Sequence, residues 1–416
     1  MRSIVGAGQV PRGACLGAES TVERPTQDTK VEDMLTTLAV ENYRSLRRIV
    51  MPLRGLNVVT GANGSGKSSL YRALRLLSDA SRNGAVAALA REGGLQSTLW
   101  AGPEHVRKDR PAQGTRRTGP VTLRMGFAGD DYGYLMDLGL PIPHGSEFDL
   151  DPEIKREALW AGPFLRPAAL LVERNNRDVR IRSGSGEWQR SGHQLQTFDS
   201  MLSEFADPER APELLVVRER MRGWRFYDHF RTDTAAPARR VQIGTRTAVL
   251  APDGSDVAAA LQTIRELSPR GTLEDAVELG FPGSRVEVVN TGGRFELAFH
   301  QRGLLRPLSG AELSDGTLRY LLWVAALLTP RPPELLVLNE PETSLHPDLL
   351  PALANLVVTA AKEAQVIVVT HSRPFIASLE ALSPDLQTLE LVKDAGATTI
   401  DGQRPLDEPP WKWPSR

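Results

Sequence analysis

The sequence predicts an α/β protein with a mostly parallel core sheet, interrupted by a compact inserted α+β lobe. Three observations predict this fold. Short β-branched runs such as residues 56–60 end directly at a glycine or a polar residue, which is typical of buried strands that lead into a turn. Helical patterns follow these runs near both ends of the chain, as in parallel sheets covered on both faces. Between residues 96 and 305, hairpin-like segments replace this alternation.

The composition limits the class of protein. The chain has 416 residues, enough for one large domain or two of ordinary size. Lys and Arg number 50 and Asp and Glu number 51, so no overall charge indicates nucleic acid or a membrane. The longest apolar run, 321–328, is far shorter than the roughly 20 residues of a membrane span. The single cysteine excludes an internal disulfide, and we expect a cytoplasmic protein.

The first part of the core is expected over residues 35–95. Residues 1–34 are Gly-rich and polar without a sustained period, so we expect a disordered tail, and Met34 is a candidate start site. Strands are predicted before and after the first turn, and a helix follows them with apolar residues at helical spacing. The predicted strands are 35–43, 49–53 and 56–60, and the helix is 68–77.

The inserted lobe is expected over residues 96–305, and the core resumes over 306–400. No heptad pattern is sustained in the lobe, which argues against a long coiled coil. The lobe is predicted to contain hairpin strands at 121–128 and 132–140 and helices around 195–205 and 212–221. The second part of the core is predicted to contain helices at 318–328 and 348–361 and strands at 335–338 and 366–370. The C-terminal tail, 401–416, is expected to pack or fray rather than to serve as a docking peptide.

A glycine-rich turn, GANGSGKS, connects the strand at 56–60 to the following helix. In the pattern GxxxxGK[ST], glycines allow backbone N–H groups to converge on phosphate oxygens at a helix N-terminus. Lys67 would reach the β- and γ-phosphates of ATP, and the Ser68 hydroxyl would bind Mg²⁺. The predicted phosphate-binding residues are Gly61, Asn63, Gly64, Ser65, Gly66, Lys67, Ser68 and Ser69.

Two further strands end at candidate catalytic and metal-binding residues. Residues 335–338 lead to Asn339 and Glu340, and ligands bind at the carboxyl ends of strands in such sheets. Glu340 is expected to polarise the water that attacks the γ-phosphate, and His371, after the strand at 366–370, to sense that phosphate. Asn339 stands where Mg²⁺ normally meets an aspartate, so either slow turnover or weak magnesium binding is open. Gln96 is a further candidate ligand of the same ion.

The motifs together resemble the SMC, RecF and OLD branch of the ABC ATPases, and most of all the stand-alone bacterial predicted AAA-family ATPases with a RecF-like head. LSDGT at 313–317 resembles the ABC signature, and SLHP at 344–347, with Ser344 and His346, resembles the D-loop. ENYRSL at 41–46 is similar to the first strand of such heads, where Arg44 would approach the nucleotide. The segment LSGAE at 308–312 is a rival signature, but a long helix begins directly after Ser314.

The resemblance implies a P-loop NTPase of the ABC ATPase head type that uses Mg²⁺ with ATP. Two subunits would sandwich two ATP molecules, with Ser314 and Gly316 of one subunit touching the γ-phosphate held by Lys67 of the other. The helix that begins near Gly316 would direct its backbone donors and dipole at this anion. Because neither half-site is complete in one subunit, we expect an ATP-dependent homodimer.

Two functions remain open. The first is a DNA-linked ATPase in DNA repair or in defence against foreign DNA. The second is a nucleotide-gated regulatory module that controls a separate effector protein, a nuclease or a toxin, without binding DNA itself. A membrane transporter is disfavoured because Lys67 and Ser314 are 247 residues apart, much farther than in transporter subunits. The residues after His371 are too few for the nuclease domain of the OLD proteins.

One segment bears on the choice between these functions. Residues 210–246 contain nine arginines and four acidic residues, interleaved with Trp224, Phe226, Tyr227 and Phe230. The pattern fits either a surface that grips phosphates and stacks bases or a solvated helix face whose aromatic side chains are buried. A second basic stretch, 107–117, is expected to be a mobile loop.

Overall fold

The structure, a computed structural model, describes residues 34–82, 84–104, 119–143 and 145–415. The predicted tail before Met34 and the whole basic stretch 107–117, which was expected to be a mobile loop, therefore lie outside the described residues. Among the described residues the strands form three sheets, which we call the core sheet, the antiparallel sheet and the small sheet.

The core sheet contains β3 (Leu56–Gly61), β10 (Arg225–Tyr227), β15 (Leu335–Asn339), β16 (Gln365–Val369), β17 (Gln387–Asp394) and β18 (Ala397–Ile400). Their order across the sheet is β10-β15-β16-β3-β17-β18. All neighbours are parallel except β17 and β18, which form an antiparallel hairpin. The mostly parallel core sheet predicted from the sequence is confirmed.

The antiparallel sheet joins the start of the chain to segments far from it. Its strands are β1 (Leu35–Tyr43), β2 (Leu46–Pro52), β4 (Leu123–Gly129), β5 (Tyr132–Gly139), β6 (Glu153–Ala161), β7 (Leu170–Asn175), β8 (Asp178–Arg182) and β9 (Trp188–Gln194). They lie in the order β2-β1-β4-β5-β6-β7-β8-β9. The small sheet is formed by β11 (Gln242–Ile243), β12 (Arg285–Thr291), β13 (Arg294–His300) and β14 (Leu308–Ser309).

The residues predicted as one inserted lobe, 96–305, are divided among all three sheets. β4 pairs with β1, with Val40 opposite Met125, so β4–β9 extend a sheet that begins before the insert. β10 forms the edge of the core sheet, and β11–β13 belong to the small sheet. The physical reason is that a strand pairs with any strand that offers an unpaired edge and an apolar face on the same side, even when the two are far apart in sequence. Residues 96–305 therefore do not form a single compact lobe. They contribute strands to the antiparallel sheet and to the small sheet, and they add β10 to the core sheet.

The helices are α1 (Lys67–Ala80), α2 (Ala85–Arg91), α3 (Gly94–Thr98), α4 (Met201–Glu204), α5 (Pro212–Gly223), α6 (Val257–Leu267), α7 (Thr272–Gly280), α8 (Asp315–Leu327), α9 (Leu350–Ala360) and α10 (Arg373–Leu382), with 3₁₀ turns η1 (Pro237–Arg239) and η2 (Pro347–Leu349). The helix predicted around 195–205 is only the short α4, because β9 extends to Gln194 and Ser200 caps the helix. No helix in the described part of the chain is long and apolar enough to cross a membrane.

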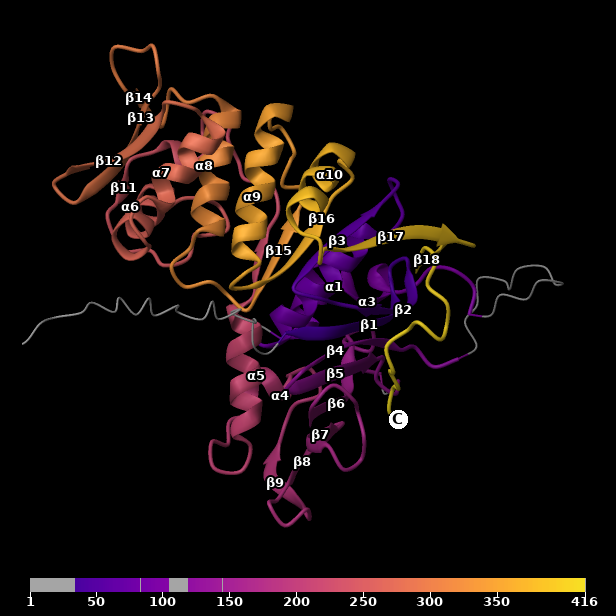
Figure 1. The fold of residues 1–416 in the computed structure, drawn as a ribbon. Helices are drawn as coiled ribbons and strands as arrows, with labels where there is room; N and C mark the ends of the chain where they lie inside the picture. The colour runs from indigo at the N-terminus through magenta and orange to yellow at the C-terminus, as the bar shows by residue number, and fades with distance from the viewer. Residues whose placement is uncertain (1–33, 83, 105–118, 144, 416) are drawn as a thin grey trace, which may run out of the picture.

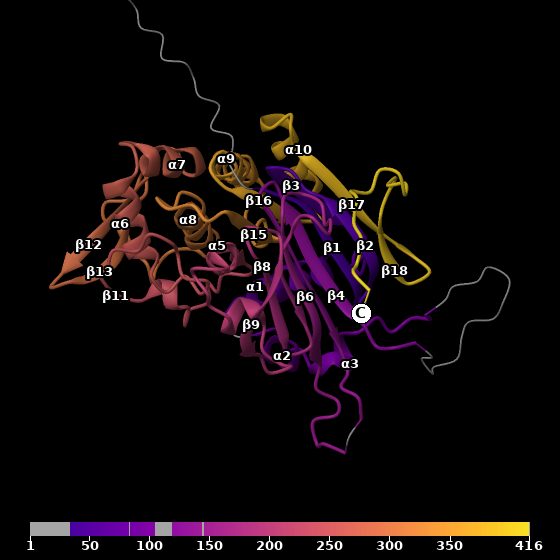
Figure 2. The same ribbon diagram turned by 90° about the horizontal axis from the view of Figure 1, so that it is seen from below.

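The core sheet separates two apolar cores (Figure 1). One contains α1 and the antiparallel sheet, and the other contains α6–α9 and Phe375 and Leu379 of α10. Val337 of β15 packs in the first core and its neighbour Leu338 in the second, because successive side chains of a strand point to opposite faces. Figure 2, seen from below, likewise shows α6 and α7 to one side of the antiparallel sheet.

The C-terminal tail is packed rather than free. The ring of Trp411 lies 5.8 Å from that of the buried Trp160 on β6, in an edge-to-face arrangement. Trp413 packs on Trp411 in turn, with 5.1 Å between ring centroids. Of the two alternatives expected from the sequence, a packed or a frayed terminus, the structure has the packed one.

Candidate nucleotide-binding site

The glycine-rich turn connects the end of β3 to the first residue of α1. Gly61 and Gly66 have φ angles of 143° and 114°, where side chains are strained. A Cβ on Gly61 would lie 2.3 Å from the Leu391 carbonyl oxygen, and one on Gly66 would lie 2.2 Å from Thr398 Oγ1. Glycine is therefore required at both positions for the loop to pack closely against β17 and β18. The tip, Asn63 and Gly64, is exposed.

Polar groups inside the loop are arranged for an anion. Lys67 is only 7% exposed, and its Nζ donates to the carbonyl oxygens of Gly61 (2.7 Å) and Ala62 (3.1 Å). The buried Ser65 hydroxyl has no hydrogen-bond partner among the described residues. A buried hydroxyl normally has a partner, so an unsatisfied one beside an ammonium group fits a phosphate oxygen.

Residues outside the motif hold this loop in place. Thr398 Oγ1 donates to the Ser65 carbonyl oxygen (2.7 Å) and lies within hydrogen-bond distance of Ser45 Oγ (2.9 Å), which in turn lies 3.2 Å from Ser69 Oγ. No sequence motif pointed to Thr398, because this residue lies in a hairpin beyond the last motif. Its hydroxyl fixes the backbone of the phosphate loop from the neighbouring strand.

Arg44 lies in the turn after β1, next to Ser45, and has a left-handed φ of 51°. Its Nη2 lies 2.6 Å from Glu92 Oε2, which also accepts a hydrogen bond from the Tyr43 hydroxyl (2.7 Å). Burial, followed by the Glu92 hydrogen bond, raises the pKa of Tyr43 above its usual value, so Tyr43 stays a donor. The turn thus brings Arg44 close to the phosphate loop, and Glu92 holds its guanidinium.

The two candidate catalytic residues are brought together. β15 and β16 are parallel neighbours, and the Glu340 amide continues their ladder by donating to the Val369 carbonyl oxygen at 2.7 Å. Glu340 Oε1 then lies 3.2 Å from His371 Nδ1, with the Glu340 and His371 side chains 40% and 54% exposed. Since β16 also pairs with β3, these two residues and the phosphate loop follow three adjacent strands. Both side chains remain accessible to a ligand.

A second carboxylate was missed by the sequence reasoning. Glu342 accepts a hydrogen bond from Thr370 Oγ1, and its Oε1 lies 4.0 Å from His371 Nδ1. Its other oxygen, Oε2, is buried without a partner among the described side chains and backbone. Burial raises the pKa of Glu342. The Glu-Pro-Glu sequence after β15 was the available signal.

Ser68 and Asn339 line one pocket of about 530 Å³ together with Asp228, which directly follows β10. Asn339 Nδ2 donates to Asp228 Oδ1 at 3.0 Å. Hydroxyl, amide and carboxylate oxygens are the donor set that Mg²⁺ prefers, so these residues fit the ion. No group of three or more His, Cys, Asp or Glu in the described ranges is arranged to hold a metal by itself, and Mg²⁺ on a triphosphate needs only one or two protein ligands.

Gln96 is not brought into this pocket. It is exposed on α3, whereas Arg91 and Glu92, a few residues earlier, line the pocket. The short α3 ends at Thr98, and Leu99 after it has extended backbone. Gln96 therefore lies within a helix and not in a loop beside Ser68. Its assignment as a metal ligand stays a prediction without support from this geometry.

The signature and D-loop residues lie next to each other. The Ser314 side chain caps α8 by accepting from the Thr317 amide (3.1 Å), and a Cβ on Gly316 would lie 3.7 Å from the Ser344 carbonyl oxygen. His346 caps η2, accepting from the Asp348 amide at 3.3 Å. α8 covers the opposite face of the core sheet from α1, so Ser314 and Lys67 belong to different faces of one subunit. The rival signature at 308–312 forms β14 and a turn.

Arg239 organises the signature loop, a role that the sequence did not indicate. Its Nη1 donates to the carbonyl oxygens of Gly310 (3.1 Å) and Leu313 (2.7 Å), and its Nη2 lies 2.7 Å from Asp315 Oδ1. The side chain is 7% exposed. One buried guanidinium therefore connects the segment before α8 to its first turn.

The arginine-rich segment 210–246 fits a solvated surface with buried aromatic side chains better than a surface that grips phosphates and stacks bases. Trp224, Tyr227 and Phe230 are buried. Each of the nine arginines has an acidic or carbonyl partner, as the following pairs show: Arg210 with Asp207, Arg218 with Phe205, Arg220 with Asp131, Arg222 with Glu219, Arg225 with Trp224, Arg231 with Asp233, Arg239 with Asp315, Arg240 with Ala235 and Arg246 with Glu266. Phe226 is half-buried and packs against the first apolar core, and the other three of the four aromatic side chains are not available to stack bases.

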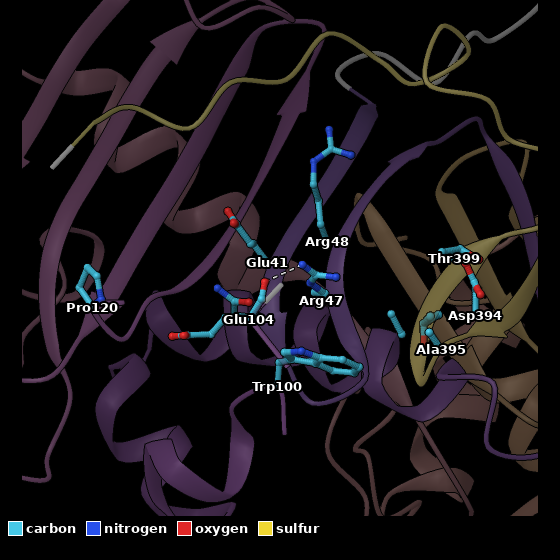
Figure 3. A pocket seen from close by; sticks show the side chains of 12 residues that line it. Glu41, Arg47, Arg48, Trp100, Glu104, Pro120, Asp394, Ala395 and Thr399 are labelled. Atoms are coloured by element: carbon cyan, nitrogen blue, oxygen red, sulfur yellow. Dashed lines mark hydrogen bonds between the residues drawn. The ribbon is translucent and has the colours of Figure 1, made fainter. Parts of the chain in front are cut away.

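A second pocket, of about 500 Å³, is lined largely by residues of β1, β2 and the hairpin of β17 and β18 (Figure 3). Arg47, Trp100, Asp394 and Thr398 are among its lining residues. Arg47 Nη2 donates to the Glu104 carbonyl oxygen at 2.7 Å, and Trp100 Nε1 to the Pro103 carbonyl oxygen at 3.2 Å. Thr398 belongs both to the lining of this polar pocket and to the residues that hold the phosphate loop.

The parallel core sheet and the glycine-rich phosphate loop before α1 define a P-loop nucleotide-binding fold. Residues 56–378 match the family described as "AAA domain, putative AbiEii toxin, Type IV TA system", and the chain belongs to this family. No curated protein matches the chain in sequence.

Among solved structures, three SMC head domains are similar at low identity. The SMC head bound to the C-winged helix domain of ScpA has 14% identity and a TM-score of 0.45, covering 88% of this chain and 97% of its own. The head from Pyrococcus furiosus, with an extended coiled coil and bound to the C-terminal domain of ScpA, has 13% identity and a TM-score of 0.47, covering 88% and 96%. The head from Thermotoga maritima has 16% identity and a TM-score of 0.38, and the match covers 88% of this chain and 97% of that one. These scores are low, so the assignment rests on the family match and the site.

Proposed function

We propose that this chain is a magnesium-dependent ATPase whose copies close in pairs around ATP. The observation that carries the proposal is the convergence of Lys67, Glu340 and His371 at the carboxyl ends of three adjacent strands. Ligands of open α/β sheets bind at this edge. The match to an ATPase family supports the same activity.

Each side chain has a role that its position supports. Lys67 would leave the carbonyl oxygens of Gly61 and Ala62 to bind phosphate, and the Ser65 hydroxyl would gain an acceptor. Glu340 would orient the attacking water and accept its proton, and His371 would donate to the γ-phosphate. Ser68 and Asn339 would hold Mg²⁺, which when bound neutralises charge on the phosphates.

The second half of the site would come from another copy of the chain. Ser314 and Gly316 lie at the start of α8, where unpaired backbone N–H groups and the helix dipole favour an anion. In one subunit α8 and α1 lie on opposite faces of the core sheet, which supports a signature that would serve a partner rather than its own loop. ATP would then act as the link between two copies.

For the role of this cycle we propose a regulatory module that controls a separate effector protein. Two observations support it over a DNA-linked ATPase. The arginines of 210–246 have partners within the chain, and Trp224, Tyr227 and Phe230 among them are buried. The family description names a putative toxin of a toxin–antitoxin system.

The test is ATP hydrolysis by the purified protein with Mg²⁺, alone and with single- or double-stranded DNA. Lys67→Ala serves as the blank. We expect Lys67-dependent turnover that DNA does not change, together with a specific protein that co-purifies. Turnover that rises with DNA would reverse the choice in favour of the DNA-linked role. Turnover equal in Lys67→Ala would refute the ATPase itself.

A further inference from the structure

We infer that Asp228 supplies the negative charge that the magnesium site lacks at Asn339. This inference rests on the proposed ATPase function and concerns the same site. Mg²⁺ binds oxygen ligands and normally meets at least one carboxylate of the protein. Asn339 is neutral, so the charge must come from elsewhere if the site is to hold the ion well.

The core sheet places Asp228 beside Asn339. β10 and β15 are parallel, with Tyr227 opposite Leu338, so the residue after Tyr227 and the residue after Leu338 lie at the same level. These next residues are Asp228 and Asn339, and Asn339 Nδ2 donates to Asp228 Oδ1 at 3.0 Å. The Asp228 carboxylate, on the strand next to the one that carries Asn339, thus lies in contact with the Asn339 amide.

The contact also fixes the orientation of the amide. An ionised carboxylate only accepts hydrogen bonds, so the NH₂ group of Asn339 must face Asp228. The amide oxygen is then left for the metal or for a water bound to it. In metal sites such outer partners orient the ligand and increase its electron-donating strength. The pair can therefore provide the oxygen and the charge that one aspartate provides elsewhere.

Asp228 is the acidic side chain of this pocket that is most weakly held. The other two, Asp79 and Glu92, lie 3.1 Å from Arg91 and 2.6 Å from Arg44. The cation nearest to Asp228, Arg75, is 3.4 Å away, with both side chains about half exposed. An exposed ion pair of this kind contributes little free energy. A cation bound near Ser68 can thus compete with Arg75 for Asp228.

The experiment measures how strongly Mg²⁺ enhances nucleotide binding by the full chain. A fluorescent ATP analogue, mant-ATP, is titrated in the Glu340→Gln background in EDTA and in saturating Mg²⁺. The ratio of the two Kd values reports the metal site. We expect Asp228→Asn to lower this ratio about tenfold or more, the scale of losses at partners of metal ligands, with the Kd in EDTA unchanged.

Matched variants separate this role from others. Asp79→Asn removes the same charge from the same pocket and should leave the ratio near that of the unchanged chain. The exchange Asp228→Asn with Asn339→Asp returns a carboxylate to the usual position and should restore the ratio. Arg75→Ala should leave the ratio unchanged or raise it, because it removes the competing cation.

The inference would be overturned by a ratio that Asp228→Asn does not change, by equal losses in Asp228→Asn and Asp79→Asn, or by a loss in Arg75→Ala that matches that of Asp228→Asn. Unchanged thermal unfolding of each variant establishes that the binding data refer to folded protein. A chain that binds no mant-ATP in either buffer would refute the ATPase proposal, a result distinct from binding without a contribution from Asp228.

Discussion

His371 Nδ1 lies 3.2 Å from Glu340 Oε1, although the two residues are 31 positions apart in the chain. Two parallel strands create this contact, since each residue follows the carboxyl end of its strand. A change in the charge or position of one side chain is therefore felt directly by the other. The pair joins the group expected to act on water to the group expected to contact the γ-phosphate.

Replacing Glu340 with Gln should trap an ATP-bound dimer. The amide keeps the shape of the side chain but cannot accept a proton from water, so ATP would bind and persist. Light scattering of Glu340→Gln at saturating ATP and Mg²⁺ should show twice the monomer mass, and the unchanged chain should show mostly monomer once ATP is consumed. A monomer of Glu340→Gln under these conditions would contradict the ATP-driven dimer.

Mixing two inactive variants should restore activity if the signature acts on a partner. Lys67→Ala removes the phosphate-binding ammonium, and Ser314→Arg blocks the start of α8. Each variant alone should lose nearly all turnover, whereas a mixed dimer contains one half-site with both residues intact. We expect turnover of the mixture well above the sum of its parts. Activity no higher than that sum would indicate that Ser314 does not serve another subunit.

Arg239→Ala should weaken the ATP-driven dimer more than it weakens ATP binding. The variant removes three contacts that fix the signature loop, but it leaves Lys67 and its surroundings untouched. Dimer mass by light scattering and mant-ATP titration measure the two effects separately. Arg246→Ala, which removes an exposed ion pair with Glu266, is the matched control. Equal behaviour of the two variants would argue against a positioning role for Arg239.

Trp411→Ala should destabilise the protein by about 2 kcal/mol, because it removes an aromatic contact and exposes the buried Trp160. Chemical denaturation followed by Trp fluorescence and circular dichroism measures the change. Leu406→Ala, in the same tail but fully exposed, should have almost no effect. If both variants unfold like the unchanged chain, the tail adds no stability.

Glu342→Gln should increase stability at neutral pH. Burial raises the pKa of Glu342 in the folded state above the usual 4.5, so folding favours the protonated form. The stabilisation from this protonation is fully present below about pH 4.5 and is lost as the pH rises through the folded value. Glutamine resembles the protonated form at every pH. The difference in free energy of unfolding between variant and unchanged chain should therefore grow from pH 4 to pH 7, and a constant difference would contradict this.

The sequence predicted those features that depend on neighbours along the chain. β1 and β3 have nearly their predicted bounds, and α1 begins at the lysine of the motif, because alternating or β-branched runs and a glycine turn are local patterns. Glu340 and His371 were found because each ends an apolar run. Their proximity followed from the expected parallel pairing of those runs.

Other features depended on pairing that no local pattern encodes. β10 has only three residues, and its partner β15 begins more than a hundred positions later, so neither the strand nor Asp228 gave a signal. Thr398 reaches the phosphate loop from a hairpin without a motif. The strands of 96–305 looked like a separate lobe because their partner β1 precedes the insertion point.

The first apolar core contains α1, strands from both ends of the chain and strands of the former insert in one continuous cluster. The helix that follows the phosphate loop, α1, therefore packs in one core with residues from before and after 96–305 in the sequence. Removal of this segment would expose the apolar side of α1, because α1 contacts β4 and α5 within it. Excising it should leave an insoluble remnant rather than a minimal ATPase, and the two sheets should melt in a single transition.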